Sequence, residues 1–217
     1  MTHQSTHENS PRRTFLKATG AAGVGLMTAG AAQQLSAEDK TTPNEMVNIA
    51  IVGCGGRGSG ATNDNMSINN NTRLVAMADI DVAKCQGLAR RMSKFGDRVT
   101  ADEKTMHGGL DAYRRVLDNK DVDVVLFATP PGFRPRHILE AVDAGKHVFA
   151  EKPTCVDPEG YRICMTAHEK AIANKTAIVT GTQYRRQTNY IGAVEKIRKG
   201  TIGDIVSATT RYCSTGI

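Results

Sequence analysis

The chain lacks the residue patterns that nucleic-acid and metal sites require. It has no tryptophan and only 5% aromatic residues, and these do not interleave with a basic stripe, so the formal net charge of +6 indicates solubility and not nucleic-acid binding. The cysteines form no CxxC pair and no metal-ligand spacing, and we expect buried free thiols and no bound metal. The five are Cys54, Cys85, Cys155, Cys164 and Cys213.

What the chain does contain is the ordinary composition of a folded protein. Of its 217 residues, 40% are hydrophobic and 23% are charged. Typical domains have about 100 to 150 residues, so this length allows one full domain and part of another.

The N-terminal segment resembles a twin-arginine export signal. Residues 10–17 read SPRRTFLK, with the pair at Arg12 and Arg13, and small, mildly apolar residues follow over 18–32. That run is too short and too glycine-rich to span a bilayer as a stable helix. We expect a signal peptide over 1–37, a linker over 38–46 and a periplasmic protein. The alternative is a disordered basic tail on a cytoplasmic protein.

A buried strand followed by a glycine-rich turn opens the remaining chain. Residues 47–52 are apolar except Asn48, which is typical of a strand buried on both faces of a parallel sheet. Gly53, Gly55 and Gly58 then fit the pattern G-x-G-x-x-G, in which the glycines allow a tight turn, close approach of a pyrophosphate and close helix packing. A glycine-rich turn without a ligand is the alternative. Gly56 and Arg57 belong to the same candidate cofactor loop.

An acidic residue at the end of the next strand favours the ligand. Residues 74–78 predict a second buried strand, and Asp79 follows it, 21 residues after Gly58. A carboxylate at this place accepts hydrogen bonds from an adenosine ribose and repels a 2′-phosphate, so NAD is favoured over NADP.

Strands and helices then alternate. We expect a helix over 82–94, a strand over 98–101, a helix over 110–117, a strand over 122–128, a helix from Pro135 to Gly145 and a strand over 148–150. This order predicts the α/β class with a doubly wound parallel sheet, a Rossmann domain over 47–175, and ligands at the carboxyl ends of the strands.

Glu151, Lys152 and Pro153 follow the last of these strands. The chain also contains ATPP at 128–131, His137 and AGKHVFAEKP at 144–153. With these residues, the glycine loop and Asp79, the chain resembles the Gfo/Idh/MocA oxidoreductase family, and its exported bacterial subgroup above all. The resemblance covers nearly everything from residue 47 onward.

The resemblance implies roles for these residues. Lys152 lies beside the nicotinamide and contacts the substrate hydroxyl, Glu151 helps to hold the cofactor together with Thr129 and Pro130, and Pro153 sits on a cis peptide. Independently, an ammonium at the carboxyl end of a central strand can polarise a carbonyl or steer an alkoxide, and partial burial lowers its pKa. A surface lysine without a role is the alternative.

Other polar residues receive structural interpretations. We expect His137 to be a packing residue, and His147 begins its strand, at the wrong end for chemistry. His168 falls on a helical stripe that we expect in the core or at its boundary, and Cys54 is a small residue between glycines, oxidisable after export. The stripe also contains Tyr161, Cys164, Met165 and Ile172.

The resemblance places the beginning of an α+β substrate domain at 176–217. We expect strands over 177–181 and 205–212 and a helix over 189–199, with Tyr184 and Arg185 as weak candidates for substrate contacts. The family's usual proton acceptor is a second-domain histidine, and none of the six histidines lies here. We therefore expect a longer protein, whose second-domain sheet would also support a homo-oligomer.

The leading hypothesis is an NAD-dependent oxidoreductase that acts on a secondary hydroxyl of a sugar, a cyclitol or a derivative. NAD-assisted glycoside hydrolysis and nucleotide binding without turnover are the alternatives. Because the twin-arginine route carries folded proteins, the dinucleotide could travel as a tightly bound group.

Overall fold

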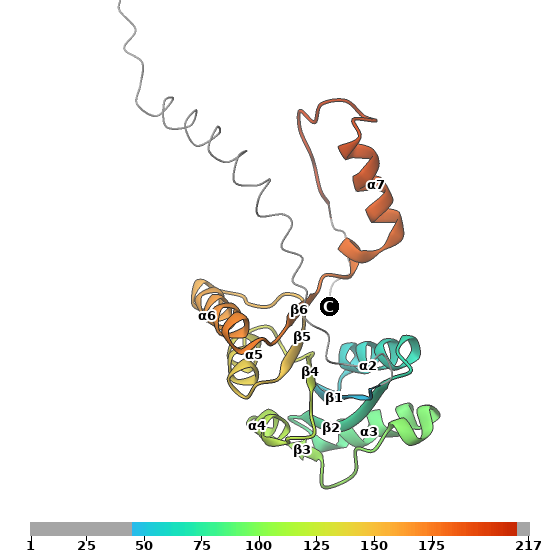
Figure 1. Ribbon diagram of the computed structural model, residues 1–217, viewed down its shortest axis with the longest axis vertical. Helices are drawn as coiled ribbons and strands as arrows, with labels where there is room; N and C mark the ends of the chain where they lie inside the picture. Colours follow the sequence, from blue (N-terminus) through green and yellow to red (C-terminus); the bar gives the residue numbers. More distant parts are fainter. Residues whose placement is uncertain (1–44, 212–217) are drawn as a thin grey trace, which may run out of the picture. The chain divides into compact units, whose positions relative to one another are not determined.

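The computed structural model describes residues 45–211 (Figure 1). The expected signal peptide, nearly all of the linker, Cys213 and the end of the last expected strand lie outside the described residues. Among the described helices, none combines the length and the apolar character needed to cross a bilayer.

Six parallel strands form one sheet in the order β3-β2-β1-β4-β5-β6. The order reverses between β1 and β4, which creates a switch point beside the carboxyl end of β1. The strands are β1 (Val47–Val52), β2 (Thr72–Asp79), β3 (Met106–Gly108), β4 (Val124–Phe127), β5 (His147–Glu151) and β6 (Ile178–Gly181).

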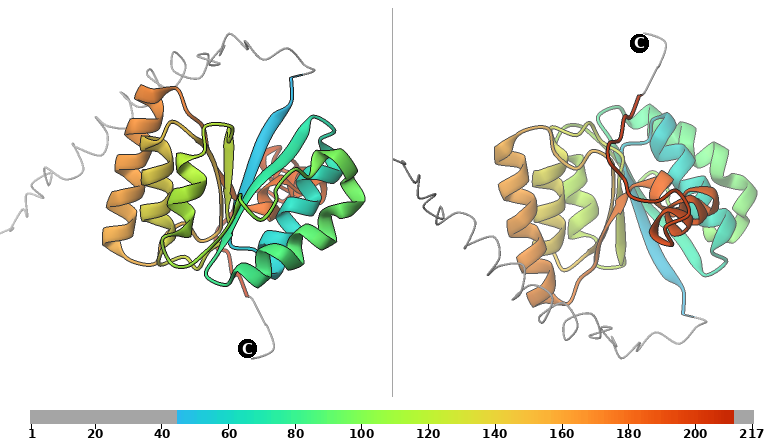
Figure 2. Two further views of the ribbon diagram at one scale, coloured as in Figure 1. Left: turned by 90° about the horizontal axis from the view of Figure 1, so that it is seen from below. Right: turned by 90° about the horizontal axis from the view of Figure 1, so that it is seen from above.

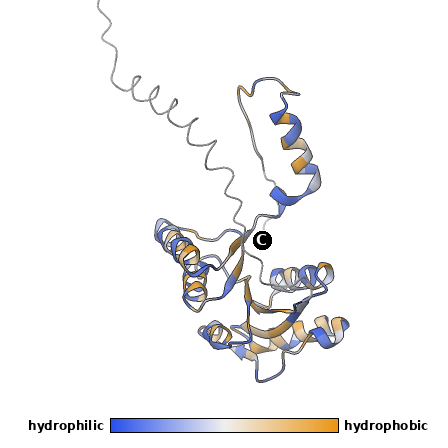
Figure 3. Ribbon diagram, viewed as in Figure 1, coloured by the Kyte–Doolittle hydropathy of each residue, from blue (hydrophilic) through white to orange (hydrophobic). Residues whose placement is uncertain are grey.

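Helices cover both faces of the sheet (Figure 2). Apolar side chains of α4, α5 and α6 pack on one face, and those of α2 and α3 pack on the other. The central strands are hydrophobic along their length (Figure 3), because both faces are buried. The helices are α2 (Gly56–Ile68), α3 (Val82–Met92), α4 (Ala112–Asp118), α5 (Arg134–Asp143), α6 (Pro158–Asn174) and α7 (Thr188–Arg198), with short 3-10 helices η1 (Ser93–Arg98) and η2 (Gln183–Arg186). The predicted α/β class and doubly wound parallel sheet are confirmed.

The strand expected over 98–101 is wrong. The amides of Thr100 and Ala101 both donate to the single carbonyl of Leu74, so no ladder can extend there. Val99 makes one isolated parallel bridge with Leu74, and a turn held by the Asp102 carboxylate, which accepts from the amides of Lys104 and Thr105, then interrupts the pairing with β2. Regular pairing resumes in the same direction, as β3.

The strand expected to open the second domain belongs to the first sheet. β6 pairs in parallel with β5, from Val148 with Ile178 to Glu151 with Gly181. The sheet therefore continues beyond the domain boundary that we expected at residue 175.

Two further expectations differ from the structure. Residues 205–211 form no strand and are exposed, since a strand pattern needs a partner strand and the described residues supply none.

On α6, Tyr161, Met165, His168 and Ile172 are exposed, so this stripe is not core. α6 packs instead through the small residues Gly160, Ala167 and Ala171. These allow the close approach to α5 that a bulky stripe would prevent.

Candidate functional site

The glycine-rich turn connects β1 to α2 and has the geometry of a phosphate cradle. Gly53 has φ +96°, in the region that favours glycine. A Cβ at Gly58 would lie 1.8 Å from the Gly53 carbonyl oxygen, so α2 packs directly on the turn. Gly55 and Gly56 face open space, and no side chain caps the N-terminus of α2. The residues fit a pyrophosphate, because free backbone amides and the helix dipole both attract an anion.

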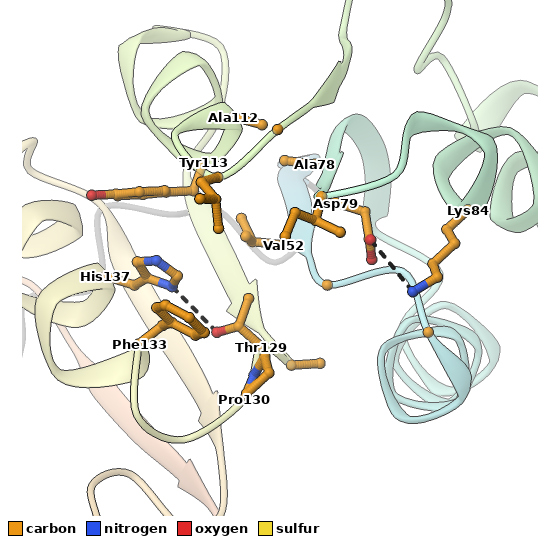
Figure 4. Close-up of a pocket in the computed structure, with 16 residues that line it drawn as sticks. Val52, Ala78, Asp79, Lys84, Ala112, Tyr113, Thr129, Pro130, Phe133 and His137 are labelled. Atoms are coloured by element: carbon orange, nitrogen blue, oxygen red, sulfur yellow. Dashed lines mark hydrogen bonds and ion pairs between the residues drawn. The ribbon is translucent and has the colours of Figure 1, made fainter.

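Asp79 ends β2 and organises the turn beside it. Its Oδ2 accepts a hydrogen bond from the Cys54 amide at 2.7 Å, and its Oδ1 accepts one from the Asp81 amide at 3.1 Å. Lys84 Nζ lies 3.7 Å from Oδ1 and forms an ion pair (Figure 4). Sequence reasoning did not identify Lys84, whose one available signal was a positive charge in the first turn of a helix, where the helix dipole disfavours it.

A pocket lies between the turn and the neighbouring strand ends (Figure 4). Gly53 and Gly55 belong to its lining, and Asp79 and Lys84 lie across it from Thr129 and Pro130, which follow β4. The structure therefore brings together the expected loop, Asp79, Thr129 and Pro130. The lining also includes Tyr113, Phe133 and His137, which the sequence did not assign to a cofactor pocket.

His137 packs among aromatic rings and also lines this pocket. Its ring centroid lies 4.1 Å from that of Tyr113, and its Nδ1 is hydrogen bonded to Thr129 Oγ1 at 3.2 Å. Burial lowers the pKa of His137 to about 4, so the ring is neutral near pH 7. The packing role expected from sequence agrees with these contacts.

Glu151 is buried at the carboxyl end of β5 and pairs with the turn. Its Oε1 accepts from Arg57 Nη2 at 2.5 Å, which joins two expected cofactor-binding residues from distant parts of the sequence. That hydrogen bond raises the pKa of Arg57. A Cβ at Gly181 of β6 would lie 2.8 Å from the Glu151 carboxylate, so this glycine makes the space for it.

Arg134, at the start of α5, holds the backbone of the same segment. Its Nη1 donates to the carbonyl of Glu151 at 2.6 Å and to that of Pro153 at 2.5 Å. The side chain is 5% exposed, and burial lowers its pKa. Sequence reasoning missed Arg134. The available signal was a positive charge at a helix N-terminus, where the helix dipole disfavours it, which indicates a specific partner.

The remaining expected residues lie apart from the pocket. Lys152 follows β5 with its side chain exposed, so the expected partial burial of its ammonium is not found. The peptide between Lys152 and Pro153 is cis, as expected. Tyr184 and Arg185 lie in η2 and are exposed. Within residues 45–211, no group of three acidic, histidine or cysteine side chains could hold a metal.

Comparison with known proteins agrees with this geometry. A family model described as an oxidoreductase family with an NAD-binding Rossmann fold matches residues 47–178. An alpha-N-acetylgalactosaminidase from Shewanella oneidensis is 24% identical over 219 aligned residues, which cover 94% of this chain and 46% of the relative. The chain thus spans about half the length of the curated relatives it matches.

Solved structures show the same fold. An NAD-binding protein from Listeria innocua is 26% identical, with a TM-score of 0.58 over 74% of this chain and 42% of that chain. A scyllo-inositol dehydrogenase from Lactobacillus casei, solved with NAD(H) and scyllo-inositol, is 23% identical, with a TM-score of 0.59 over 74% and 43%. The turn, the acidic strand end and the matched model lead to one conclusion: this chain belongs to the Gfo/Idh/MocA oxidoreductase family, with its NAD-binding Rossmann fold.

Proposed function

We propose that the protein oxidises a secondary hydroxyl of a sugar, a cyclitol or a sugar derivative with a nicotinamide dinucleotide. One observation carries the proposal: the glycine-rich turn, Asp79 and the Glu151–Lys152 segment all lie at the carboxyl edge of one parallel sheet, beside its switch point. The scyllo-inositol dehydrogenase of the same fold supports this substrate class.

Each of these residues has a distinct task. The turn amides and the N-terminus of α2 hold the pyrophosphate, and the Asp79 carboxylate holds the adenosine ribose. Arg134 and Arg57 fix the Glu151 segment and so set the direction in which Lys152 leaves β5. The dinucleotide, when bound, supplies a hydride acceptor.

Lys152 acts on the substrate oxygen. Its exposed ammonium can donate a hydrogen bond to the hydroxyl and stabilise the negative charge that develops when the proton leaves. The proton acceptor that the family resemblance implies is a second-domain histidine, and residues 176–217 contain no histidine.

We further propose NAD as the preferred cofactor, because the Asp79 carboxylate repels a 2′-phosphate. Lys84 lies 3.7 Å from that carboxylate and offsets part of its charge, so the preference is moderate.

Export of the folded protein to the periplasm by the twin-arginine route would carry the dinucleotide as a tightly bound group. Loss of the dinucleotide on simple dialysis would contradict this last part.

A second candidate function is NAD-assisted glycoside hydrolysis. A curated relative from Shewanella that is named as a family 109 glycosyl hydrolase matches 94% of this chain, as does one named as an alpha-N-acetylgalactosaminidase. In such a reaction the substrate is oxidised only transiently, which acidifies a neighbouring C–H and permits elimination of the aglycone.

One assay distinguishes these functions. Cyclitols and sugars are offered with NAD, and chromogenic aryl glycosides are offered separately. NADH accumulation supports the dehydrogenase, whereas release of the aryl group without net NADH supports the hydrolase. Lys152→Ala should abolish either activity, while Lys104→Ala, an exposed lysine in a distant turn, should retain it. Binding of NAD with neither activity, or full activity in Lys152→Ala, would contradict the proposal.

A further inference from the structure

Two buried thiols face each other beside the glycine-rich turn. Cys54 lies in the turn between β1 and α2, and Cys85 is the fourth residue of α3. Cys54 Sγ donates a hydrogen bond to Cys85 Sγ at 3.6 Å, across a separation of 31 positions in sequence. Both side chains are at most 1% exposed. The sequence, with no CxxC motif, gave no reason to pair them.

The turn has the freedom to bring the two sulfurs together. A disulfide has an S–S length of about 2.05 Å, so the sulfurs must approach by about 1.5 Å. Cys54 is followed by Gly55, which is exposed and faces open space. The other contacts of the sulfurs are weak: Cys54 Sγ lies 3.6 Å from the Ala78 carbonyl, and Cys85 Sγ lies 3.9 Å from the His107 carbonyl.

The environment makes the two thiols unequal. The hydrogen bond from Cys54 lowers the pKa of Cys85. The same hydrogen bond, together with burial, raises the pKa of Cys54. Cys85 is therefore the thiol that ionises first, and the thiolate is the attacking form in thiol–disulfide exchange.

We propose that Cys54 and Cys85 form a reversible disulfide that ties the glycine-rich turn to α3. When the glycine-rich turn opens locally and exposes the two thiols to a small-molecule disulfide, the Cys85 thiolate attacks one sulfur of that oxidant and releases the first small thiol. Cys54 then attacks the Cys85 sulfur of the mixed disulfide and releases the second. The protein loses two protons and two electrons in total, and the oxidant is reduced to two thiols.

The bond would act on the cofactor site through Asp79. The backbone amide of Cys54 donates to Asp79 Oδ2 at 2.7 Å, so fixing Cys54 to α3 also fixes this amide on the carboxylate. Oxidation therefore stabilises the arrangement of turn and carboxylate. The proposal is independent of the substrate and of the reaction.

Peptide mapping tests this directly. The 217-residue chain is incubated with oxidised or reduced glutathione, alkylated and digested with trypsin without reduction. After oxidation we expect the peptide that contains Cys54 to be linked to the one that contains Cys85, and the melting temperature to rise by about 5 °C. Both effects should vanish in Cys85→Ala and persist in Cys164→Ala, a part-buried cysteine elsewhere.

The mapping of the unmodified chain needs no variant to fold. Recovery of Cys54 and Cys85 as separate alkylated peptides after oxidation would overturn the proposal. Linkage of either one to a different cysteine, or a link between Cys155 and Cys164 alone, would overturn it as well.

Discussion

Replacement of Arg134 by alanine tests how the Glu151–Lys152 segment is held. The variant loses two charge-assisted hydrogen bonds, from Nη1 to the carbonyls of Glu151 and Pro153, which contribute about 1.5–3 kcal/mol each. Against this, Arg134 Nε is buried without a partner among the described residues, and removing it recovers about 1–3 kcal/mol. We therefore expect the free energy of unfolding to fall by about 2–4 kcal/mol.

Arg136→Ala is the matched control, since it lies on the same helix two residues later. Arg136 is 71% exposed and pairs with Glu140 at 2.9 Å, so its loss should cost less than about 1 kcal/mol. Urea unfolding followed by circular dichroism measures both variants, with an unchanged m-value as the check that the unfolding transition is comparable. A loss for Arg134→Ala no larger than that for Arg136→Ala would refute the reasoning that the buried guanidinium holds this segment.

Three further changes test the turn, the ribose site and the aromatic cluster. Gly58→Ala places a Cβ 1.8 Å from the Gly53 oxygen, so we expect about 3 kcal/mol of destabilisation and loss of NAD binding. The control is Gly60→Ala, whose Cβ meets no backbone atom, and this variant should bind NAD normally. Calorimetric titration with NAD compares the two variants. Asp79→Asn should weaken NAD binding about 10-fold and reduce the ratio of NAD affinity to NADP affinity. An unchanged ratio of the two affinities would count against the role of the Asp79 carboxylate at the adenosine ribose. The unfolded chain binds a proton at His137 near pH 6.5, whereas the folded chain binds it only near pH 4. The free energy of unfolding should therefore be at its full value above pH 6.5 and fall by about 2–3 kcal/mol as the pH decreases to 4. In urea unfolding measured across this pH range, His137→Gln should flatten the dependence.

Local patterns predicted the elements that surround the turn. The apolar run before Gly53, the glycine spacing and the acidic strand end each depend on residues close in sequence, and all three appear where expected. The helix that follows residue 157 begins at Pro158 with Asp157 as its N-cap, because the Asp157 carboxylate accepts from the Gly160 amide. Each of these features can be recognised from residues within a few positions, and the N-cap contact itself spans only three.

Failures occurred where a pattern needed a distant partner. Alternation over 205–212 described a strand in sequence, but a strand forms only when a neighbour pairs with it. The stripe on α6 was misread for the same kind of reason, since Ala167 and Ala171 set the distance to α5 and left Tyr161 and Ile172 outside.

The sequence by itself determined the family, the parallel α/β sheet and the turn that suits a dinucleotide, because these depend on local spacing and on hydrophobic periodicity. Only the tertiary structure decided that Arg57 meets Glu151, that Arg134 holds two carbonyls and that Cys54 faces Cys85. Those contacts join residues from 17 to 94 positions apart, and side-chain contacts over such separations are set by how strands and helices stack and not by any local preference of the chain.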